Sequence, residues 1–318
     1  MSGNPILVGG EALYDLVLDE HGNVTGHAGG GPFNTARTIG RLGRRAAFLG
    51  RLSSDRLGAM HERMLADDGV DLACVVHSTD PTTLALASFD RAGGAASYSF
   101  YTDGTAAAGL TPEDALAVLP AAVAALHVGT LGLVLEPLAS AIEAVVERLA
   151  GQTTIVLDPN VRSQAIACEQ AYRARVERLI SRSDVVKVSE EDLAWLDPDR
   201  SPQAAARAVL GRGPSAVLLT RGADGALVVT HGGDTPIAAV PAEVVDTIGA
   251  GDAFGGGFLA WWISRALRRA DLAQDDLVVQ AARFAAVVAA RTVAQAGAVP
   301  PRVLENAAAG PLAEASLG

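Results

Sequence analysis

The sequence predicts an α/β fold that combines a large, mainly parallel sheet with a second, small antiparallel sheet. Two observations carry this prediction. Through most of the chain, short apolar runs alternate with longer stretches of helical periodicity, a pattern that is typical of a parallel sheet covered by helices. Two further β-rich segments have no helix between their strands, so they cannot easily join a parallel sheet.

The elements around the large sheet follow from the length and period of these runs. Buried strands are expected at residues 6–8, 47–49, 126–128, 154–157, 185–188 and 216–219. Helices are expected at residues 32–42, 55–66, 138–150, 169–180 and 202–210. The chain shows no internal repeat and no long low-complexity linker, which favours a single domain over residues 1–318.

The small sheet is predicted from two segments that interrupt this alternation. The first, at about 11–28, continues directly from the first strand and contains the turn-forming His21-Gly22-Asn23. The second, at about 82–104, has two β-type runs that flank Asp90-Arg-Ala-Gly-Gly, a hairpin signal. We expect both to project from the main domain. A surface hairpin without function is the alternative.

Charge and composition exclude several classes of protein. With 36 acidic against 25 basic side chains the net charge is −11, which gives no electrostatic basis for binding nucleic acid. Hydrophobic residues make up 49% and charged residues 19%, which is enough for a core and excludes disorder. No apolar run is long enough to suggest a membrane span.

Cysteine and lysine usage narrow the class further. Cys74 and Cys168 are the only cysteines, so a disulfide framework and a cysteine zinc cluster are excluded. Lys187 is the only lysine and follows two valines, which excludes a Walker A loop and the protein-kinase pattern. The first residues lack the basic stretch and apolar core of a signal peptide, and we expect a cytoplasmic protein.

The segment with the clearest chemistry is 245–262, where a polar, glycine-rich turn leads directly into an apolar helical pattern. Such a turn leaves the first helix amides unpaired, and the helix dipole adds partial positive charge in front of them. The residues Ile248-Gly249-Ala250-Gly251 are therefore predicted to bind an anion, for which phosphate is the best fit.

Asp252 follows this turn directly. Its carboxylate would repel a phosphate, so an acid at this place is unfavourable unless it has to take up a proton. Phosphoryl transfer to an alcohol has that need, because the hydroxyl loses its proton. An aspartate of ordinary pKa suffices if it mainly orients the hydroxyl and accepts the proton late. The alternative is a helix cap, a role that aspartate commonly has.

A second glycine-rich segment, Gly29-Gly30-Gly31-Pro32-Phe33-Asn34, leads into the helix predicted at 32–42, with proline at the first helical position. Three glycines and a carboxamide suit a backbone that lies close to a polyhydroxyl ligand. A loop that merely enters a helix is the alternative. Asp15, in an apolar run ahead of this loop, is either a strand-edge acid that faces water or an acceptor for sugar hydroxyls.

Together these segments resemble the PfkB (ribokinase-like) family of carbohydrate kinases. Residues 246–252 (DTIGAGD) are similar to the family's C-terminal signature and residues 29–43 to its N-terminal one. Shorter pieces agree across residues 5–300 and are closest to the fructokinase and 2-keto-3-deoxygluconate kinase branch: Gly9-Gly10-Glu11-Ala12 with Asp15, Asp158-Pro-Asn-Val-Arg162, Lys187-Val-Ser-Glu-Glu-Asp192 and Thr220-Arg-Gly-Ala-Asp-Gly225.

The resemblance implies a doubly wound, ribokinase-like sheet with helices on both faces and a small β-sheet that acts as a lid. It implies an ATP-dependent kinase for a primary hydroxyl of a small sugar, with Mg²⁺ carried on the ATP phosphates and a homodimer formed through the lid. The residues it implies are catalytic Asp252 with Gly249, Ala250 and Gly251; sugar-binding Asp15, Gly30, Gly31 and Asn34; and nucleotide-binding Thr220, Gly222, Gly225 and Gly251, with part of residues 285–297 over the adenine.

Two departures from the family concern metal ions. The family often has Asn-x-x-Glu near the metal and phosphates, whereas this chain has Ser189-Glu-Glu-Asp192, so Asp192 is predicted only to lie near Mg²⁺. Many members hold K⁺ through backbone oxygens in the region of Asp246 and position 248, where Ile248 replaces the usual threonine. A backbone ligand survives that change, so K⁺ binding stays an alternative.

Four further residues each have two interpretations. Arg162 lies just beyond a buried strand and would contact phosphate or an acid substrate, or else pair with a surface carboxylate. Lys187 ends a buried strand and would reach the ATP phosphates, or else serve as an isolated charge. Tyr101 and His27 would touch the substrate from the lid, or else only pack within it.

The leading prediction is a sugar kinase of the fructokinase type. A 2-keto-3-deoxygluconate kinase would need a cation for the substrate carboxylate, from Arg162, Arg91, Arg37 or Arg41, and residues 100–102 lack the arginine of the acid-specific branch. A nucleoside kinase would need aromatic side chains to stack on a base, and Phe, Tyr and Trp are few at 7, 4 and 3. A non-catalytic sugar sensor is the alternative from another class, which an intact Asp252 disfavours.

Overall fold

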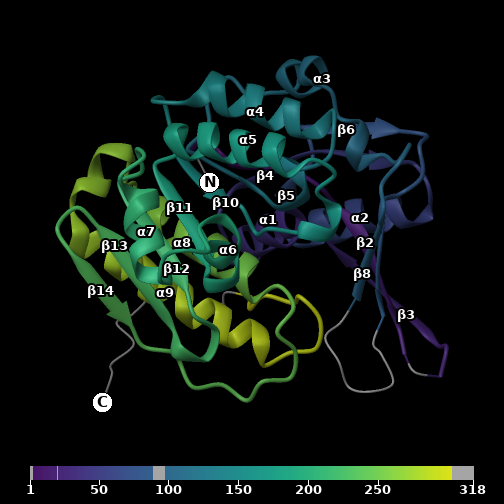
Figure 1. Ribbon diagram of the computed structural model, residues 1–318. Helices are drawn as coiled ribbons and strands as arrows, with labels where there is room; N and C mark the ends of the chain where they lie inside the picture. The colour runs from purple at the N-terminus through teal and green to yellow at the C-terminus, as the bar shows by residue number, and fades with distance from the viewer. Residues whose placement is uncertain (1–2, 20, 89–96, 303–318) are drawn as a thin grey trace.

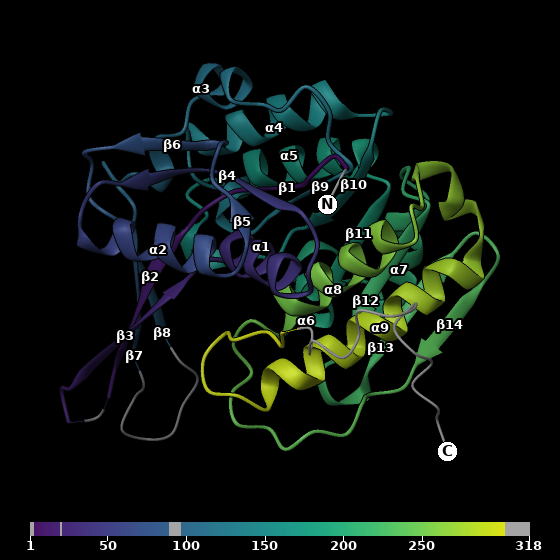
Figure 2. The same ribbon diagram turned by 180° about the vertical axis from the view of Figure 1, so that it is seen from behind.

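The computed structural model describes residues 3–19, 21–88 and 97–302. A large sheet lies between two layers of helices, and a small sheet projects from one side of it (Figures 1 and 2). The predicted α/β class and the presence of a separate small sheet are thus confirmed. The predicted turn at 90–94, the candidate cation Arg91 and the tail after residue 302 lie outside the described residues.

The large sheet has the strand order β14-β13-β12-β11-β10-β9-β1-β4-β5, with β6 paired to β4. All pairs from β12 to β5 and β6 are parallel, while β13 and β14 extend one edge as an antiparallel hairpin that the sequence analysis did not predict. The strands are β1 (Ile6–Gly9), β4 (Ala46–Ser53), β5 (Val70–Asp71), β6 (Val75–Ser78), β9 (Ala125–Gly129), β10 (Thr154–Asp158), β11 (Val185–Ser189), β12 (Ala216–Thr220), β13 (Ala226–Thr230) and β14 (Asp234–Ile237).

Helices cover both faces of this sheet, which confirms the doubly wound arrangement. On one face lie α3 (Pro112–Ala117), α4 (Leu138–Leu149), α5 (Glu169–Arg182), α6 (Glu190–Leu196) and α7 (Pro202–Leu210). On the other lie α1 (Gly31–Arg41), α2 (Arg56–Asp67), α8 (Ala250–Ser264) and α9 (Asp275–Val293). Short 3₁₀ turns complete the connections: η1 (Ala107–Gly109), η2 (Thr130–Leu133), η3 (Ser163–Ala165), η4 (Gly222–Asp224) and η5 (Arg269–Ala273).

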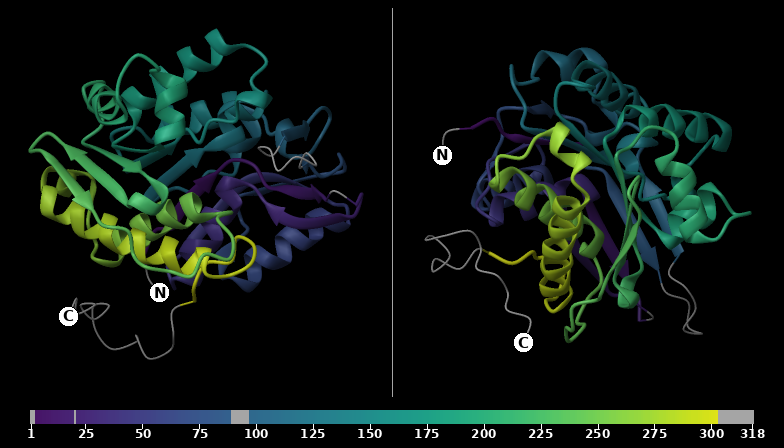
Figure 3. Two further views of the ribbon diagram at one scale, coloured as in Figure 1. Left: turned by 60° about the horizontal axis from the view of Figure 1, so that its bottom comes forward. Right: turned by 90° about the vertical axis from the view of Figure 1, so that its left-hand side faces the viewer.

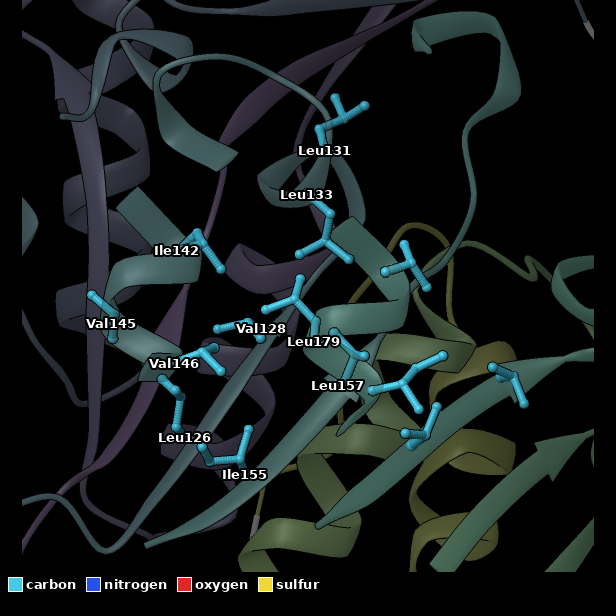
Figure 4. Close-up of a cluster of buried hydrophobic side chains, with 14 of the residues drawn as sticks. Leu126, Val128, Leu131, Leu133, Ile142, Val145, Val146, Ile155, Leu157 and Leu179 are labelled. Carbon is cyan, nitrogen blue, oxygen red and sulfur yellow. The ribbon is translucent and has the colours of Figure 1, made fainter. Parts of the chain in front are cut away.

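Two apolar cores arise from the alternation of side chains along the strands. In β1, Leu7 belongs to one core and its neighbours Ile6 and Val8 to the other, because successive strand residues point to opposite faces. Figure 4 shows the first core, where residues of β9 and β10 pack against α4 and α5. Each fully buried aliphatic side chain there contributes about 1.5–3 kcal/mol. The sheet that carries the site is therefore held from both sides.

The small sheet has the order β3-β2-β7-β8 and consists of β2 (Leu13–Leu18), β3 (Val24–Gly29), β7 (Leu84–Ser88) and β8 (Ser97–Tyr101). Its two outer pairs are antiparallel as predicted, but its central pair, β2 with β7, is parallel. The reason lies in the large sheet. Since β2 continues from β1 and β7 follows β6, and β1 and β6 run in the same direction, both strands enter the small sheet pointing outward.

Helix α8 contacts its neighbours through glycines, and it lies alongside α9 on the sheet (Figure 3). A Cβ atom on Gly257 would lie 3.1 Å from the side chain of Val288 in α9. One on Gly256 would lie 2.8 Å from the side chain of Thr38 in α1. The run Gly255-Gly256-Gly257 thus allows close packing of three helices. No helix in the described part of the chain has the length and hydropathy needed to cross a bilayer.

We expect Gly256→Ala to lower the free energy of unfolding by about 1–3 kcal/mol, because overpacking against Thr38 outweighs the better helix propensity of alanine. Guanidinium denaturation followed by circular dichroism measures the change. Gly211→Ala is the matched control, since Gly211 ends α7 with a helical φ of −64° and has only ordinary contacts. This second change should be neutral or slightly stabilising; equal losses would contradict the packing argument.

Candidate active site

The candidate site lies where the parallel strands end and α8 begins. The loops that follow β1, β9, β10 and β11 all leave the carboxyl edge of the sheet, which is the edge where open α/β sheets bind ligands. Two residues in these loops have positive φ without being glycine, namely Thr130 at 56° and Asn160 at 39°. Their side chains are joined by a hydrogen bond of 3.3 Å from Asn160 Nδ2 to Thr130 Oγ1. Such backbone strain is typical of functional sites.

The first turn of α8 has the geometry predicted for anion binding. Gly249 precedes the helix in the left-handed region, with φ 77° and ψ 1°, and no side chain of the described residues caps the helix there. A Cβ atom on Gly249 would lie 2.5 Å from that of Ala298, so glycine is required for space as well. Gly249, Ala250 and Gly251 are partly exposed, whereas Asp252 is only 8% exposed. The residues of this turn are thus partly exposed, with the amide of Ala250 donating to the backbone oxygen of Thr247 at 3.3 Å, whereas the side chain beside them is buried.

Asp252 is held by the other predicted glycine-rich segment. Asn34 Nδ2 donates to Asp252 Oδ2 at 2.9 Å, although 218 residues separate the two in the sequence. Thr35 Oγ1 donates to the backbone oxygen of Asp252 at 3.4 Å. The Asp252 carboxylate thus accepts a hydrogen bond from α1. A helix cap would instead accept one from an amide of α8, and that is not the contact observed. The sequence analysis assigned Asn34 to sugar binding and Asp252 to the role of base, and the structure brings these two side chains into contact.

Burial raises the pKa of Asp252 to about 6, and the negative charge of Asp158 adds to this rise. The hydrogen bond from Asn34 and the positive charges of Lys187 and Arg162 act in the opposite direction. The sequence analysis assumed an ordinary aspartate, so the elevated value is a difference that follows from burial. A carboxylate with this pKa is ionised at neutral pH and is a stronger base than an exposed one.

The loop before α1 lies tightly against the same carboxylate. Gly30 has φ 107°, and a Cβ atom there would lie 2.7 Å from the backbone oxygen of Glu11. A Cβ atom on Gly31 would lie 2.4 Å from Thr130 Oγ1 and 3.2 Å from Asp252 Oδ1. Gly30 therefore lets the loop pack against the backbone of Glu11, and Gly31 brings the backbone close to Asp252.

Glu11 is a member of the site that the sequence analysis did not single out. Its carboxylate is fully buried and accepts hydrogen bonds from the amides of Gly31, at 3.2 Å, and Gly132, at 2.9 Å. Burial raises its pKa to about 8; the backbone hydrogen bonds oppose this, and the charge of Asp252 adds to it. Glu11 thus ties the glycine loop to the turn after β9. Glu11 belongs to Gly9-Gly10-Glu11-Ala12, one of the pieces that resemble the family, but the sequence analysis assigned it no role of its own.

Asp15 lies on one face of the small sheet, near Arg162 in the loop after β10. It is paired with His27 across β2 and β3, and a Cβ atom on Gly29 would lie 2.0 Å from Asp15 Oδ2. Burial raises the pKa of Asp15 to about 6, against the nearby positive charges of Arg162 and His27. Arg162 also acts on Asp252, so one cation lowers the pKa of both carboxylates.

Tyr101 is not brought to this group of residues. In the register of the small sheet, Asp15 is opposite Ala85, and Ala85 is opposite Phe100, so these three share a face. Tyr101 follows Phe100 and therefore belongs to the opposite face, where it is 56% exposed. Of the two interpretations of Tyr101, contact with the substrate therefore has no support in this register, because a one-residue step along a strand changes the face.

Lys187 is buried rather than exposed to a ligand. It is 3% exposed, and its Nζ atom donates to Asp158 Oδ2 at 2.7 Å. Burial alone would lower the pKa of Lys187, but the attraction of Asp158 outweighs this and raises it. Of the two interpretations of Lys187, contact with ATP phosphates has no support in this geometry.

The three residues predicted to line the nucleotide lie at the carboxyl end of β12 and in the turn that follows. Thr220 is paired with Ser189 at the ends of β12 and β11 and donates to the backbone oxygen of Val188 at 3.3 Å. Gly222 has open space at its Cβ position. Gly225 instead lies against the end of β14, where a Cβ atom would be 2.2 Å from the backbone oxygen of Ile237.

Asp192 has a clear structural role. Its Oδ2 accepts from the amide and hydroxyl of Ser189, both at 2.8 Å, which completes a capping box at the start of α6. Its Oδ1 accepts from the amide of Val161 at 2.7 Å. Within residues 3–19, 21–88 and 97–302, no group of three or more His, Cys, Asp or Glu side chains is arranged to hold a metal ion. These contacts do not fit direct metal coordination by Asp192.

The segments around Asp246 and Gly297 are joined, as a shared ion site would require. Asp246 Oδ1 accepts from the amide of Ile248 and Asp246 Oδ2 from the amide of Gly297, both at 2.9 Å. The amides of Val245 and Asp246 donate to the backbone oxygen of Val293 at 2.8 and 3.1 Å. The loop that leads into α8 is thereby fixed to the chain that follows α9.

Two of the arginines proposed for an acid substrate are engaged elsewhere. Arg37 Nε lies 2.8 Å from Asp68 Oδ2 and Arg41 Nη1 2.9 Å from Asp68 Oδ1, in a buried cluster. Arg162 by contrast makes only long contacts, of 3.3 and 3.4 Å, to neighbouring backbone oxygens. It is the one of these candidates in the described residues whose charge acts on Asp15 and Asp252.

The fold and this constellation define a phosphotransferase that acts on a hydroxyl group: a partly exposed helix start without a side-chain cap for an anion among the described residues, a buried carboxylate base, and a glycine loop and small sheet beside them. A family model confirms this class. Residues 5–304 match the model described as pfkB family carbohydrate kinase, and the chain belongs to that family.

Relatives of known name agree with this assignment. The chain is 36% identical over 260 residues to a fructokinase of Rhizobium leguminosarum bv. trifolii, covering 80% of this chain and 78% of that protein. It is 31% identical over 302 residues to fructokinase-1 of Zea mays, covering 92% of each. The crystal structure of a fructokinase with bound ATP from Xylella fastidiosa superposes with a TM-score of 0.83 at 26% identity, covering 92% and 93% of the two chains.

We expect Asn34→Leu to raise the pKa of Asp252 above about 6, because the variant keeps the site buried and removes the hydrogen bond that favours the carboxylate. A ¹³C-carboxyl NMR titration measures this directly. Asn23→Leu is the control, since Asn23 donates to Asp19 in the small sheet, away from the site. An unchanged Asp252 titration in Asn34→Leu would contradict the role given to this contact.

Proposed function

We propose that this carbohydrate kinase is a fructokinase-type enzyme that transfers the γ-phosphoryl group of ATP to a primary hydroxyl of a small neutral sugar. The observation that carries the proposal is the buried Asp252 carboxylate in the first turn of α8, where no side chain of the described residues caps the helix, and its hydrogen bond from Asn34. Fructokinases among the relatives and solved structures support the substrate class. One kinase domain over the whole chain is part of the proposal.

Asp252 acts as the base. As the sugar oxygen bonds to the γ-phosphorus, the bond from that phosphorus to the ADP oxygen breaks, the hydroxyl proton passes to Asp252 Oδ, and ADP leaves with the electron pair. Asn34 keeps one carboxylate oxygen in place, and burial keeps water away from it. The amides of Gly249, Ala250 and Gly251 hold the migrating group, and Arg162 neutralises the charge that it carries.

The sugar is held between the glycine loop and the small sheet. Asp15 accepts from sugar hydroxyls, since a carboxylate can bind two of them, while Gly30 and Gly31 allow the ring to approach the backbone. Asn34 Oδ1 is buried without a hydrogen-bond partner among the described atoms and is available to a hydroxyl donor. Phe100, on the face that carries Asp15, replaces Tyr101 as the aromatic side chain against the sugar.

The nucleotide is placed along the ends of β11 and β12, beside Thr220 and Gly222, with the chain after α9 near the adenine. A fructokinase of Vibrio cholerae with fructose, ADP and calcium ion bound has a TM-score of 0.79 at 28% identity, covering 93% and 94% of the chains. In the present chain Mg²⁺ would be carried by the ATP phosphates and would neutralise their charge. Asp192 orders the loop after β10 and is not needed as a ligand.

A K⁺ site would fit between residues 246–248 and 293–298. The hydrogen bonds of Asp246 and the shared acceptor Val293 already bring the two segments together. Backbone oxygens would be the ligands, so the side chain of Ile248, which is 48% exposed, does not interfere. Bound K⁺ would stabilise the turn that leads to Gly249.

A homodimer through the small sheet is also part of the proposal. Val24 and Tyr101 are each 56% exposed and belong to the face of this sheet that is turned away from Asp15. Exposed large apolar side chains on one face are typical of protein interfaces. Tyr101 would therefore contact a second copy of the chain rather than the sugar.

An acid substrate is the second candidate, because Arg162 lacks a close carboxylate partner within the described chain. At neutral pH the ionised carboxylates of Asp15 and Asp252 nevertheless outnumber Arg162, because Lys187 is paired with Asp158, and this favours a neutral sugar. A nucleoside is the third candidate, since an aminoimidazole riboside kinase of Salmonella enterica has a TM-score of 0.80 at 27% identity, covering 93% and 95% of the chains.

An assay of ADP release with ATP over a panel of hexoses, pentoses, nucleosides and aldonic acids tests the substrate class. We expect fructose to give the highest kcat/KM, and aldonic acids to react poorly because of the acidic lining. Turnover of an acid or a nucleoside alone would assign the second or third candidate. Sugar binding by calorimetry without any turnover would show a sensor.

We expect Asp252→Asn to lower kcat by about 10²–10⁴-fold while sugar affinity stays nearly constant, since the amide keeps the shape but cannot take the proton. For the wild type, kcat/KM should fall at least tenfold per pH unit below about 6, because Asp252 is active only when ionised and protonation of Asp15, whose pKa is also about 6, weakens sugar binding. Steady-state kinetics between pH 4.5 and 8 test both statements. A normal rate in the variant would remove Asp252 from the mechanism.

A further inference from the structure

Three buried polar side chains lie beneath α8, on the face of the large sheet that this helix covers. His127, Asp158 and Lys187 come from the adjacent central strands β9, β10 and β11 and are 2%, 1% and 3% exposed. His127 is opposite Val156, two residues before Asp158, so the two side chains share a face. Polar groups at such depth cost free energy unless they are well paired.

The glycines of α8 make room for these side chains. A Cβ atom on Gly251 would lie 3.1 Å from Lys187 Nζ, and one on Gly255 would lie 3.1 Å from His127 Nε2. Gly251 and Gly255 are four residues apart and thus lie on the same face of the helix. The Lys187 side chain therefore runs beneath α8, and its ammonium group ends directly under the first turn.

The position of this ammonium group is unfavourable for packing alone. The N-terminal end of a helix carries partial positive charge, which repels a cation. Asp158 Oδ2 accepts from Lys187 Nζ at 2.7 Å and compensates for this repulsion. Asp158 Oδ1 and both ring nitrogens of His127, however, lack hydrogen-bond partners in the part of the chain that the structure describes. Apolar residues of similar volume would fill the same space at lower cost. The geometry thus places a positive charge where the fold itself does not need it.

We propose that Lys187 is a positioning residue that adds positive charge to the anion-binding turn from beneath α8, with Asp158 holding its ammonium group in place. The proposal rests on the proposed function, in which the γ-phosphoryl group is the anion. It replaces the expected contact of Lys187 with ATP, because the backbone of Gly251 lies between the ammonium group and the ligand side of the turn.

Lys187 also acts on the base. The titratable groups that face Asp252 come from four segments: Glu11 before β2, Asp158 from β10, Arg162 from the loop after β10, and Lys187 from β11. Lys187 favours the ionised form of Asp252, and Asp158 disfavours it. If both charges are removed, their opposite effects on the pKa of Asp252 therefore largely cancel. The positive charge beneath the turn is nevertheless lost.

The test compares Lys187→Met with the double variant Lys187→Met/Asp158→Asn. The single variant leaves Asp158 buried without its cation, and we expect lower stability, a kcat about 10²-fold lower, and an acid limb of the pH–rate profile moved to higher pH. In the double variant no unpaired charge remains, so thermal stability and the acid limb should return toward the wild type while kcat stays low. A pair with a purely structural role would regain kcat together with stability, and that result would overturn the proposal.

Two comparisons sharpen this test. Arg207→Met removes a cation from an exposed pair with Asp234, away from the site, and should change kcat less than about twofold. If Lys187→Met instead raises the KM for ATP tenfold or more at unchanged kcat, Lys187 is an ATP ligand and the proposal is wrong. If the wild type phosphorylates no sugar at all, the proposed function fails, which is a different result from an active double variant.

A second readout does not need turnover. Because Lys187 is the only lysine of the chain, labelling with [¹³Cε]lysine gives a single NMR signal. We expect this signal to shift when ADP with aluminium fluoride, a mimic of the migrating phosphoryl group, binds in the presence of fructose, and to shift much less with ADP alone. An unchanged signal at saturation, established by calorimetry, would overturn the proposal.

Discussion

The burial of one carboxylate at the start of α8 is the constraint on which the rest of the site depends. Asp252 is useful as a base because burial raises its pKa, and it tolerates burial because Asn34 donates to it and Lys187 and Arg162 lie nearby. Each of these partners comes from a different element. The first turn of α1, the ends of the central strands and the start of α8 must therefore all be in place before Asp252 has its properties.

Glycine makes this convergence possible in two distinct ways. At Gly30 and Gly249 the backbone adopts positive φ, which other residues avoid. At Gly31, Gly251 and Gly255 the requirement is space, because neighbouring side chains already occupy the Cβ position. The glycine-rich motifs of the chain thus reflect the crowding around the carboxylate as much as the approach of a ligand.

The small sheet completes the site through its connections to the large one. Both β2 and β7 continue outward from parallel strands, which makes the central pair parallel and fixes which residues share a face. Asp15 and Phe100 consequently face the loop that carries Arg162, and Tyr101 faces away. The negative charges of Asp15 and Asp252, which share the single cation Arg162, suit a neutral polyhydroxyl substrate better than an acid.

The sequence by itself determined the α/β class, the six central strands, the helices between them, the two glycine-rich segments and the family, because these depend on local periodicity and on short motifs with steric requirements. It also predicted Asn34 and Asp252, since their motifs are specific. Only the tertiary structure decided what long-range contacts control: the face on which Tyr101 lies, the ion pair that buries Lys187, the backbone contacts of Asp192 and the place of Glu11. A linear sequence carries no register between distant strands and no burial, and these two quantities set both the direction of a side chain and the pKa of a carboxylate.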